Sequence, residues 1–281
     1  MQSEMQNVVD GLTFAEGLRW HDHRLWFSDM YANEVHTWSD SRGDEIVVRT
    51  ESSPSGLGWT LDGELLIASM EDRLLLRVDG TGGTTVFADL SAHTPHPIND
   101  MVIDTDGRAY IGEFGFDLNG GADPSPGVII AVEPDGTHKV VAEDLTFPNG
   151  MVITDLGRTL VFAETFAGRL SALDKNDDGT LSNPRLWAAL PEGATPDGIC
   201  IDSEGAVWAA TIGTGECIRV AEGGEILDRV NVGETLAIAC CLGGREGRTL
   251  FVATSDHIAP DLCHEHRHSG IKAFGVEVGA A

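Results

Sequence analysis

The sequence predicts an all-β protein with the fold of a six-bladed β-propeller. An apolar strand, a tight turn and a second strand recur six times, in the segments EGLRWHDHRLWFSD, SGLGWTLDGELLIAS, NDMVIDTDGRAYIGE, NGMVITDLGRTLVFAE, DGICIDSEGAVWAAT and LAIACCLGGREGRTLFVAT. The second strands begin between Leu25 and Leu250, which are 225 residues apart, so five intervals give a period of 45 residues. That period suits a blade of four antiparallel strands, of which two are plain in each repeat.

Each repeat has the same internal order. A polar residue and a small residue open an apolar run, a turn such as D-G follows, and a β-branched or aromatic run ends in Ser, Thr, Asp or Glu. The two outer strands are expected between repeats, as at 34–38 and 45–50 after the first. The sixth repeat is followed by one further strand, 271–278, whereas 5–9 precedes the first repeat. We therefore predict that the N-terminal segment supplies the outer strand of the last blade and closes the ring.

Length and composition agree with one propeller domain over residues 1–281. Hydrophobic residues make up 42% of the chain, enough for a continuous core. There is no apolar run of about 18 residues that would span a bilayer, and the start, MQSEMQNVVDGLTF, does not resemble a signal peptide. We expect a cytoplasmic protein with no membrane partner. The five cysteines form no C-x-x-C pair and are expected to be reduced and mostly buried, with a disulfide at Cys240 or Cys241 as the alternative.

The charge is strongly acidic. Asp and Glu number 45 against 18 Lys and Arg, which gives a formal net charge of −27. Such a surface repels phosphate backbones, so nucleic acid is excluded as a partner. Solubility or adaptation to salt is the simplest account of the charge. A small neutral molecule would meet no repulsion, and the sequence does not indicate an oligomeric state.

One polar residue stands at the opening of each repeat. These residues are Glu16, Ser55, Asn99, Asn149, Asp197 and Thr235. Because the first strands of a propeller run along its axis, we expect the six side chains to meet at one mouth of the central tunnel. Two carboxylates and two amides suit a hard divalent cation, and the lack of His and Cys argues against an obligate zinc site. Any one of these residues alone would be read as an ordinary turn former, but four in phase favour a cation.

Several motifs in this order carry a family resemblance. They are F-A-E-G-L at Glu16, H-P-I-N-D-M at Asn99, G-E-F-G-F-D-L at 112–118, F-P-N-G-M at Asn149 and T-P-D-G-I at Asp197. Together they resemble the senescence marker protein/gluconolactonase/luciferin-regenerating enzyme family over nearly the whole chain. The resemblance implies a six-bladed propeller that holds one divalent metal through Glu16, Asn149 and Asp197. Calcium is the expected ion, with zinc, magnesium and manganese as alternatives.

The activity that the resemblance implies is hydrolysis of a sugar lactone or a similar cyclic ester. The residue chemistry agrees, since a metal polarises a carbonyl and lowers the pKa of bound water while a carboxylate accepts the proton. Asp197 is our candidate for that base as well as for a ligand. Asn99 is implied to bind substrate or to complete the outer shell of the metal. Asp100 is assigned with it to substrate binding, with a strand-start hydrogen bond as an equal alternative.

Two positions depart from the family pattern. Leu18 stands where many members have Pro, and Pro97 stands where an Arg often precedes the N-D motif. That Arg is implied to hold sugar hydroxyls, so its replacement favours a less polar lactone or ester. His93 and His96 lie on the same connection, where a solvated loop position is the simpler expectation.

The ends of the second strands form a second polar series on the same face. Its members are Asp29, Ser69, Glu113, Glu164, Thr211 and Thr254. Glu113 is predicted to bind substrate and Glu164 is a weaker candidate, with exposed strand-end carboxylates as the alternative. The Gly- and Pro-rich segment 114–126 is long enough to form a lid. Its Phe114 and Phe116 are expected either to pack on an apolar substrate or to anchor the loop.

Other functions and motifs remain in view. An organophosphate or other ester hydrolase would use the same metal site, and a metal-stabilised binding propeller would have no turnover. D-K-N-D-D-G at 174–179 lacks a twelfth-position Glu and is expected to form a hairpin turn rather than a calcium loop. H-E-H-R-H at 264–268 is expected to lie in a loop and to bind metal only adventitiously, and no G-x-S-x-G motif supports a serine nucleophile.

Overall fold

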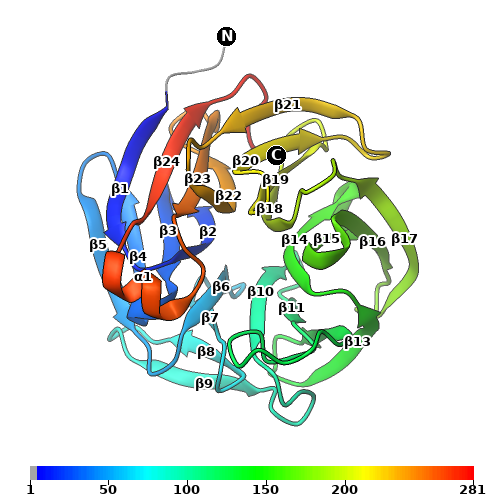
Figure 1. Cartoon of the computed structure of the whole chain (residues 1–281). Coiled ribbons are helices and arrows are strands. Elements are labelled where there is room, and N and C mark those ends of the chain that lie inside the picture. Colours follow the sequence, from blue (N-terminus) through cyan, green and yellow to red (C-terminus); the bar gives the residue numbers. More distant parts are fainter. Residues whose placement is uncertain (1–4) are drawn as a thin grey trace.

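Six four-stranded antiparallel sheets stand as blades around a central axis in the computed structural model, which describes residues 5–281 (Figure 1). From the axis outward, the first three blades are β2 (Ala15–His21), β3 (Arg24–Asp29), β4 (Glu34–Ser39) and β5 (Gly43–Arg49); β6 (Pro54–Trp59), β7 (Leu65–Ser69), β8 (Leu74–Val78) and β9 (Thr84–Asp89); and β10 (Ile98–Ile103), β11 (Ala109–Glu113), β12 (Gly127–Val132) and β13 (His138–Leu145). The other three are β14 (Pro148–Thr154), β15 (Thr159–Glu164), β16 (Arg169–Lys175) and β17 (Leu181–Ala189); β18 (Pro196–Ile201), β19 (Val207–Thr211), β20 (Glu216–Val220) and β21 (Ile226–Asn231); and β22 (Leu236–Gly243), β23 (Thr249–Ser255), β24 (Ser269–Gly275) and β1 (Gln6–Leu12). The predicted fold class is therefore confirmed.

The last blade contains both ends of the ring. β1 pairs antiparallel with β24, with Gln6 opposite Ala273 and Leu12 opposite Ser269. Figure 1 shows this blue strand beside the red one. The predicted closure by the N-terminal segment is confirmed, although the strand runs three residues beyond the expected end at residue 9. Closing the ring in this way replaces an open sheet edge with paired backbone groups.

The core lies between the blades. Every residue of β7, β11, β15 and β19 is buried, because second strands pack on both faces against neighbouring blades. Outer strands such as β9 expose most of their residues. This gradient explains why the second strands were the plainest in the sequence. All five cysteines are free, and Cys200 is the half-buried exception among them.

Short helical segments lie outside the blades. They are η1 (Met30–Ala32), η2 (Asp155–Gly157), η3 (Thr165–Ala167) and α1 (Pro260–His266). The loop expected at 264–268 is corrected in part, because α1 extends through His266; Pro260 at its start and Asp261 in its first turn favour a helix there. The segment 174–179 leads from β16 into β17 as a hairpin, as expected. Within residues 5–281, none of the helices has the length and apolar character needed to cross a bilayer.

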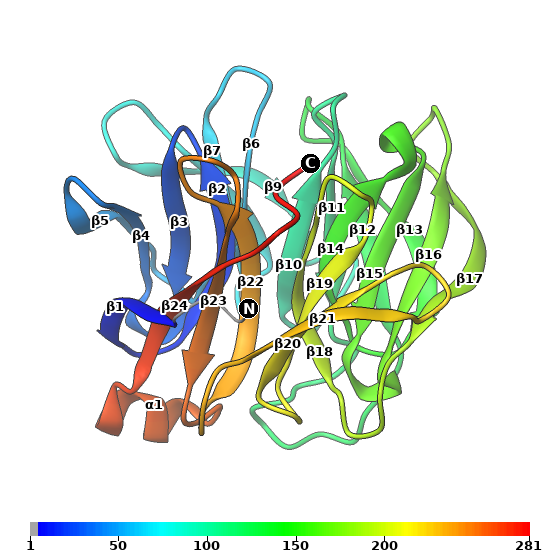
Figure 2. The ribbon, with the colours of Figure 1, turned by 90° about the horizontal axis from the view of Figure 1, so that it is seen from above.

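The two faces of the ring differ in what they carry. First strands begin and second strands end on the same face, and α1 marks that face because it follows the end of β23. Figure 2 shows α1 on one rim and the C-terminus on the opposite side. We call the rim with α1 the α1 face.

Candidate functional site

A register break lies near the start of every first strand. In β2 it falls between Glu16 and Arg19, and in β14 between Pro148 and Met151. The other four first strands break at the equivalent point. Such bulges add a residue to one strand and redirect a side chain. The polar and small pair that opens most repeats is therefore the bulge, which accounts for its place in the sequence pattern.

The small residue of that pair allows neighbouring blades to approach. A Cβ atom on Gly17 would lie 2.2 Å from the carbonyl oxygen of Ser55, in the next blade. A Cβ atom on Gly150 would lie 2.6 Å from the carbonyl oxygen of Asp197, again one blade further on. The first strands can pack this closely only where no side chain intervenes. This packing brings the adjacent polar residues toward a common axis.

The polar residues at the bulges are buried and form a chain of hydrogen bonds. Ser55 Oγ donates to Asn99 Oδ1 at 2.9 Å, and Asn99 Nδ2 donates to Asn149 Oδ1 at 2.9 Å. Asn149 Nδ2 in turn donates to Thr165 Oγ1 at 3.3 Å. Glu16 and Asp197 are equally buried, each 5% exposed. We call Glu16, Ser55, Asn99, Asn149 and Asp197 the inner ring.

The two carboxylates of the inner ring have strongly perturbed pKa values. Burial, and after it the charge of Asp100, raises the pKa of Glu16 to about 8. Burial followed by repulsion from Glu16 and Asp100 raises the pKa of Asp197 well above its ordinary value, although a hydrogen bond from Asn149 opposes this. Asp197 thus experiences Glu16 and Asp100 as like charges, and Glu16 experiences Asp100 as one, in a poorly solvated place. The arrangement favours a positive charge between them.

Asp100 has a partner of its own. Its Oδ1 accepts from Arg19 Nη2 at 2.6 Å and from the backbone N–H of Met101 at 2.8 Å. Arg19 Nη2 also donates to the carbonyl of Met101 at 2.5 Å, which ties the first strands of blades one and three together. These contacts give the Asp100 carboxylate a structural role in holding the first strands together. Substrate binding by Asp100 stays a prediction.

Thr235 does not join the inner ring, contrary to expectation. In blade six Ala237 pairs with Thr254, and the register break falls between Ala237 and Ala239. The residue at the bulge, equivalent to Glu16 in blade one, is therefore Ile238. Thr235 lies before β22 and donates from Oγ1 to the carbonyl of Val232 at 3.1 Å. The run L-A-I-A-C-C lacks the polar and small pair, and that absence was the available signal in the sequence.

Glu113 and Glu164 are both buried, so the exposed alternative is excluded for each. Glu113 accepts from the backbone N–H of Gly115 at 2.7 Å, and burial raises its pKa. Glu164 is fully engaged by Arg169 Nε at 2.6 Å, by the Thr146 N–H at 2.8 Å and by Ser171 Oγ. Glu164 is therefore a structural acid, whereas Glu113 stays a substrate-binding prediction.

The connection that was predicted to form a lid is anchored by its phenylalanines. Phe114 and Phe116 are buried, and the Phe114 ring stacks on Phe147 with centroids 4.4 Å apart. Of the two loop histidines, His93 pairs with His138 at 2.7 Å on the outer strand β13, which directs it away from the inner ring. The second histidine, His96, interacts electrostatically with Glu113 and lowers the pKa of that carboxyl, against the effect of burial.

A second group of ionisable residues, of which Asp29 and His36 are buried, lies within blade one. Asp29, Glu34 and His36 have potential ligand atoms within 4.8 Å of one another, and no other such group occurs among residues 5–281. His36 Nδ1 lies 2.9 Å from Asp44 Oδ1, and its Nε2 lies 3.2 Å from Glu34 Oε2. Burial lowers the pKa of His36, but Asp44, Asp29 and Glu34 together outweigh it and raise that pKa. Both ring nitrogens of His36 already face carboxylate oxygens, so we interpret Asp29, Glu34, His36 and Asp44, the blade-one cluster, as an ion-pair network.

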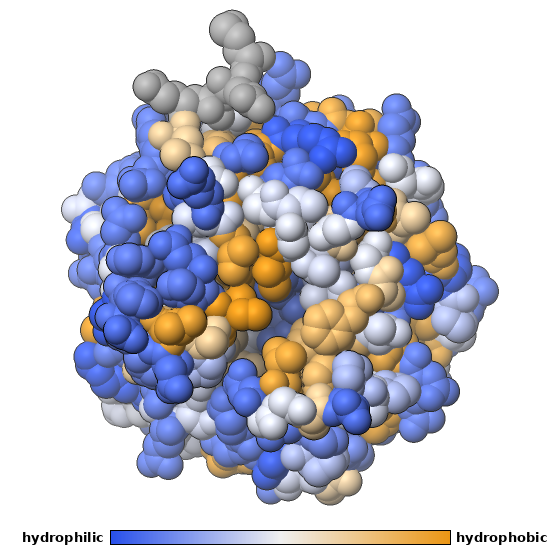
Figure 3. Space-filling view, in the orientation of Figure 1, coloured by the Kyte–Doolittle hydropathy of each residue, from blue (hydrophilic) through white to orange (hydrophobic). Residues whose placement is uncertain are grey.

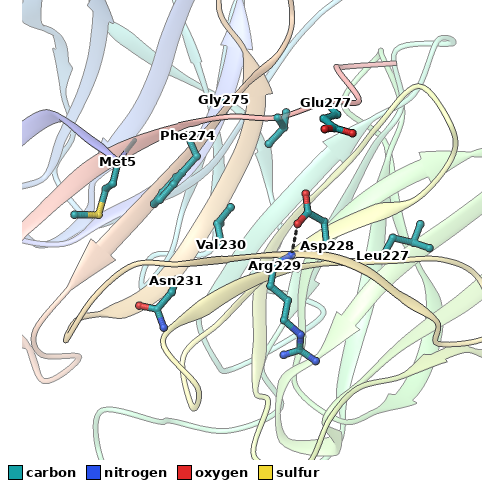
Figure 4. A pocket seen from close by; sticks show the side chains of 10 residues that line it. Met5, Leu227, Asp228, Arg229, Val230, Asn231, Phe274, Gly275 and Glu277 are labelled. Atoms are coloured by element: carbon teal, nitrogen blue, oxygen red, sulfur yellow. Dashed lines mark hydrogen bonds between the residues drawn. The ribbon is translucent and has the colours of Figure 1, made fainter. Parts of the chain in front are cut away.

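The inner ring lies toward the α1 face, because its residues stand near the starts of the first strands, and this face has a hollow at its centre. Figure 3 shows apolar residues gathered around this hollow, with hydrophilic residues deeper inside. The opposite end of the tunnel opens into a cavity of about 420 Å³ lined by Arg19, Cys200 and Cys240 among others. A separate groove of about 380 Å³ lies between β21 and β24 and contains no inner-ring residue (Figure 4). Neither cavity contains an inner-ring residue, and the inner ring is nearer to the α1 face than to the opposite end of the first strands.

Comparison with known protein families shows which family the chain belongs to. Residues 14–256 match the family described as SMP-30/Gluconolactonase/LRE-like region. The chain belongs to this family. The resemblance that the motifs indicated is thus confirmed.

Named relatives of the chain include lactonases and regucalcins. A pentonolactonase of Haloferax volcanii is 26% identical over 253 residues, which cover 88% of this chain and 84% of that protein. A regucalcin of Danio rerio is 28% identical over 85% of this chain and 81% of its own length. Among solved structures, a calcium-binding regucalcin from Agrobacterium tumefaciens superposes with a TM-score of 0.82 at 22% identity, covering 99% of this chain and 96% of that one. The structural likeness supports the fold, and the named activities belong to those proteins.

Proposed function

We propose that this protein is a lactonase that depends on one divalent cation, held by Glu16, Asn149 and Asp197. The observation that carries the proposal is the burial of two mutually repelling carboxylates at the bulges of β2 and β18. Beside them, the side-chain amides of Asn99 and Asn149 are held in fixed directions by a hydrogen bond. Lactonases among the relatives support the reaction class. Calcium is the ion that we assign, because the donors are oxygen atoms.

Charge balance at the inner ring supports a divalent ion. Glu16, Asp100 and Asp197 interact electrostatically with one another, and Arg19 is ion-paired to Asp100 alone among them. When all three carboxylates are ionised, as they would be around a bound cation, one guanidinium leaves two negative charges. Buried charge is costly unless it is paired or binds a metal. A divalent cation would balance this remaining charge.

The protein's own side chains account for orientation and proton transfer. A divalent cation, when bound, would polarise the lactone carbonyl and make water more acidic. Asp197 is assigned to accept the proton of the attacking water, because it is a buried carboxylate that would stand beside any water held by the cation. The accepted proton would then be available to the alkoxide that leaves when the ring opens.

Asn99 is assigned to hold the substrate. Its Oδ1 is fixed by Ser55 and one hydrogen of its Nδ2 by Asn149, so the direction of the amide group is determined. An amide nitrogen carries a second hydrogen, which we assign to the carbonyl oxygen of the substrate. Glu113, at the end of the second strand in the same blade, is assigned to a polar group of the substrate.

The test is a lactone panel assayed by acid release at constant pH. Turnover should disappear with a chelator and return on addition of calcium, while circular dichroism shows that the fold is retained. Turnover that persists in chelator would contradict the metal assignment. Phosphotriesters or other esters cleaved in place of lactones would favour the alternative hydrolase. Loss of fold with no turnover of any ester would favour a binding propeller.

A further inference from the structure

The end of each second strand is followed by a residue that faces the same rim as the inner ring. In four of the six blades this residue is apolar, namely Met30, Met70, Phe114 and Ile212. Met30, Met70, Phe114, Phe116 and Phe147 belong to one contiguous cluster that also includes Ile238 of the sixth blade, and Ile212 packs against it. We call Met30, Met70, Phe114, Phe116, Phe147 and Phe166 the apolar collar. Figure 3 shows apolar surface around the central hollow of this face.

Four phenylalanines form one continuous stack of rings in the collar, with two contacts stacked and two tilted. Phe147 stacks on Phe114 at 4.4 Å and contacts Phe166 at 4.7 Å. Phe116 lies 5.7 Å from Phe147 and 6.0 Å from Phe166. Ring contacts of this kind hold the side chains in place. We call the four rings the aromatic wall, of which Phe114, Phe116 and Phe147 are buried. Phe166, at the outer end, is 50% exposed.

The stack is joined directly to the inner ring. Phe147 stands two residues before Asn149 and has a φ angle of 55°, in the left-handed region that a bulky side chain rarely adopts. Thr165, which accepts a hydrogen bond from Asn149 Nδ2, precedes Phe166 in η3. Backbone strain of this kind persists where the surroundings enforce it. A molecule that reaches Asn149 from the α1 face therefore passes this aromatic wall.

From this juxtaposition we infer that the substrates are lactones with an alkyl or aryl substituent, rather than polyhydroxylated lactones; the inference rests on the proposed function. The carbon and sulfur atoms of the collar provide no hydrogen bonds to hydroxyl groups, which would lose their bonds to water without replacement. An apolar substituent on the same wall gains about 25 cal/mol for each Å² of surface removed from water. The polar side chains of the inner ring are then left to bind the carbonyl group of the lactone.

A substrate series tests the inference in the calcium-loaded protein. From δ-valerolactone to δ-decalactone we expect kcat/KM to rise by about threefold for each added methylene that reaches the collar. D-glucono-δ-lactone should be cleaved less efficiently than any of the alkyl lactones. A preference for gluconolactone, or no dependence on chain length, would overturn the inference and leave the proposed lactonase function standing.

Phe166→Ala removes the exposed end of the stack. We expect it to lower kcat/KM for δ-decalactone about tenfold more than for δ-valerolactone, because the longer substituent loses its contact. Leu186→Ala is the matched control, since Leu186 is 59% exposed on the outer strand β17, and it should leave both substrates unchanged. Equal losses on both substrates would contradict a role in recognising the substituent.

Binding of lactams separates the two proposals, because lactams keep the carbonyl but resist hydrolysis. Calorimetry should show that the alkyl δ-lactam of decalactone length binds the calcium-loaded protein more tightly than gluconolactam, and that Phe166→Ala removes most of the difference. If the alkyl lactam binds more tightly as expected but no lactone is turned over, the proposed function is contradicted and the inference about the ligand stands. Tighter binding of gluconolactam would sink the inference.

Discussion

The inner ring and the blade-one cluster each contain at least one buried carboxylate, and the two groups are stabilised differently. In the blade-one cluster, Asp29 accepts from the backbone N–H groups of Thr13 and Phe14 at 2.9 Å each, and Glu34 Oε1 pairs with Arg49 at 2.7 Å. His36 supplies a further proton donor between Glu34 and Asp44. In the inner ring, Glu16 and Asp197 repel each other. Burial of acids is therefore common to both groups, and the supply of donors distinguishes a structural cluster from a candidate cation site.

The largest effect should follow from Asp197→Asn, which keeps the shape of the side chain but removes its charge and basicity. We expect kcat/KM for a cleaved lactone to fall by about a thousandfold or more. Asp62→Asn, at an exposed hairpin turn, is the matched control and should have no effect. Initial-rate kinetics with saturating calcium measure both. Full turnover by Asp197→Asn would end the assignment of Asp197 as base.

Asp29→Ala should act on stability rather than on chemistry. It leaves two buried backbone donors without their acceptor, so we expect a loss of about 3 kcal/mol in the free energy of unfolding. Urea denaturation measures this, with the exposed Asp40→Ala as control. A loss below about 0.5 kcal/mol would show that the blade-one cluster is not the network described here.

Gly150→Ala tests whether close packing of the first strands holds the inner ring together. The added Cβ atom would lie 2.6 Å from Asp197 O and Ile199 N, so the neighbouring strand has to shift. We expect about 2 kcal/mol of destabilisation and weaker calcium binding. Gly80→Ala, where a Cβ atom has open space, is the control. Unchanged stability and calcium affinity in Gly150→Ala would contradict the packing argument.

The smallest effect concerns pH. The pKa of His36 is raised in the folded state, so the stability that its protonation confers is fully present below the unfolded value near 6.5 and is lost as pH rises through the folded value. The difference in thermal midpoint between the wild type and His36→Gln should therefore shrink between pH 6 and pH 9. His264→Gln, on the exposed side of α1, should show no such trend. A difference in thermal midpoint between wild type and His36→Gln that grows with pH would contradict a raised pKa of His36.

Much of the fold could be predicted because the repeat restates the same physical rule six times. Second strands are buried on both faces and so are plainly apolar, and the polar and small pair marks the bulge of most first strands. Thr235 was misplaced because blade six carries Ile238 at its bulge, and only strand pairing reveals that register.

The collar and the blade-one cluster were harder to predict for a different reason. Phe147 and Phe166 lie in turns without periodicity, and their meeting depends on the paths of two loops. His36 and Asp44 stand on neighbouring outer strands, where the alternation is weak. Contacts of this kind are fixed by tertiary packing and leave no local pattern.

Calcium binding measured by calorimetry on the metal-free protein tests the central claim most directly. The wild type should bind one calcium ion per chain, Glu16→Gln and Asp197→Asn should each weaken binding by about a hundredfold or more, and His36→Gln should bind as the wild type does. Undiminished affinity in both inner-ring variants, or loss of calcium binding in His36→Gln, would place the ion elsewhere and contradict the account.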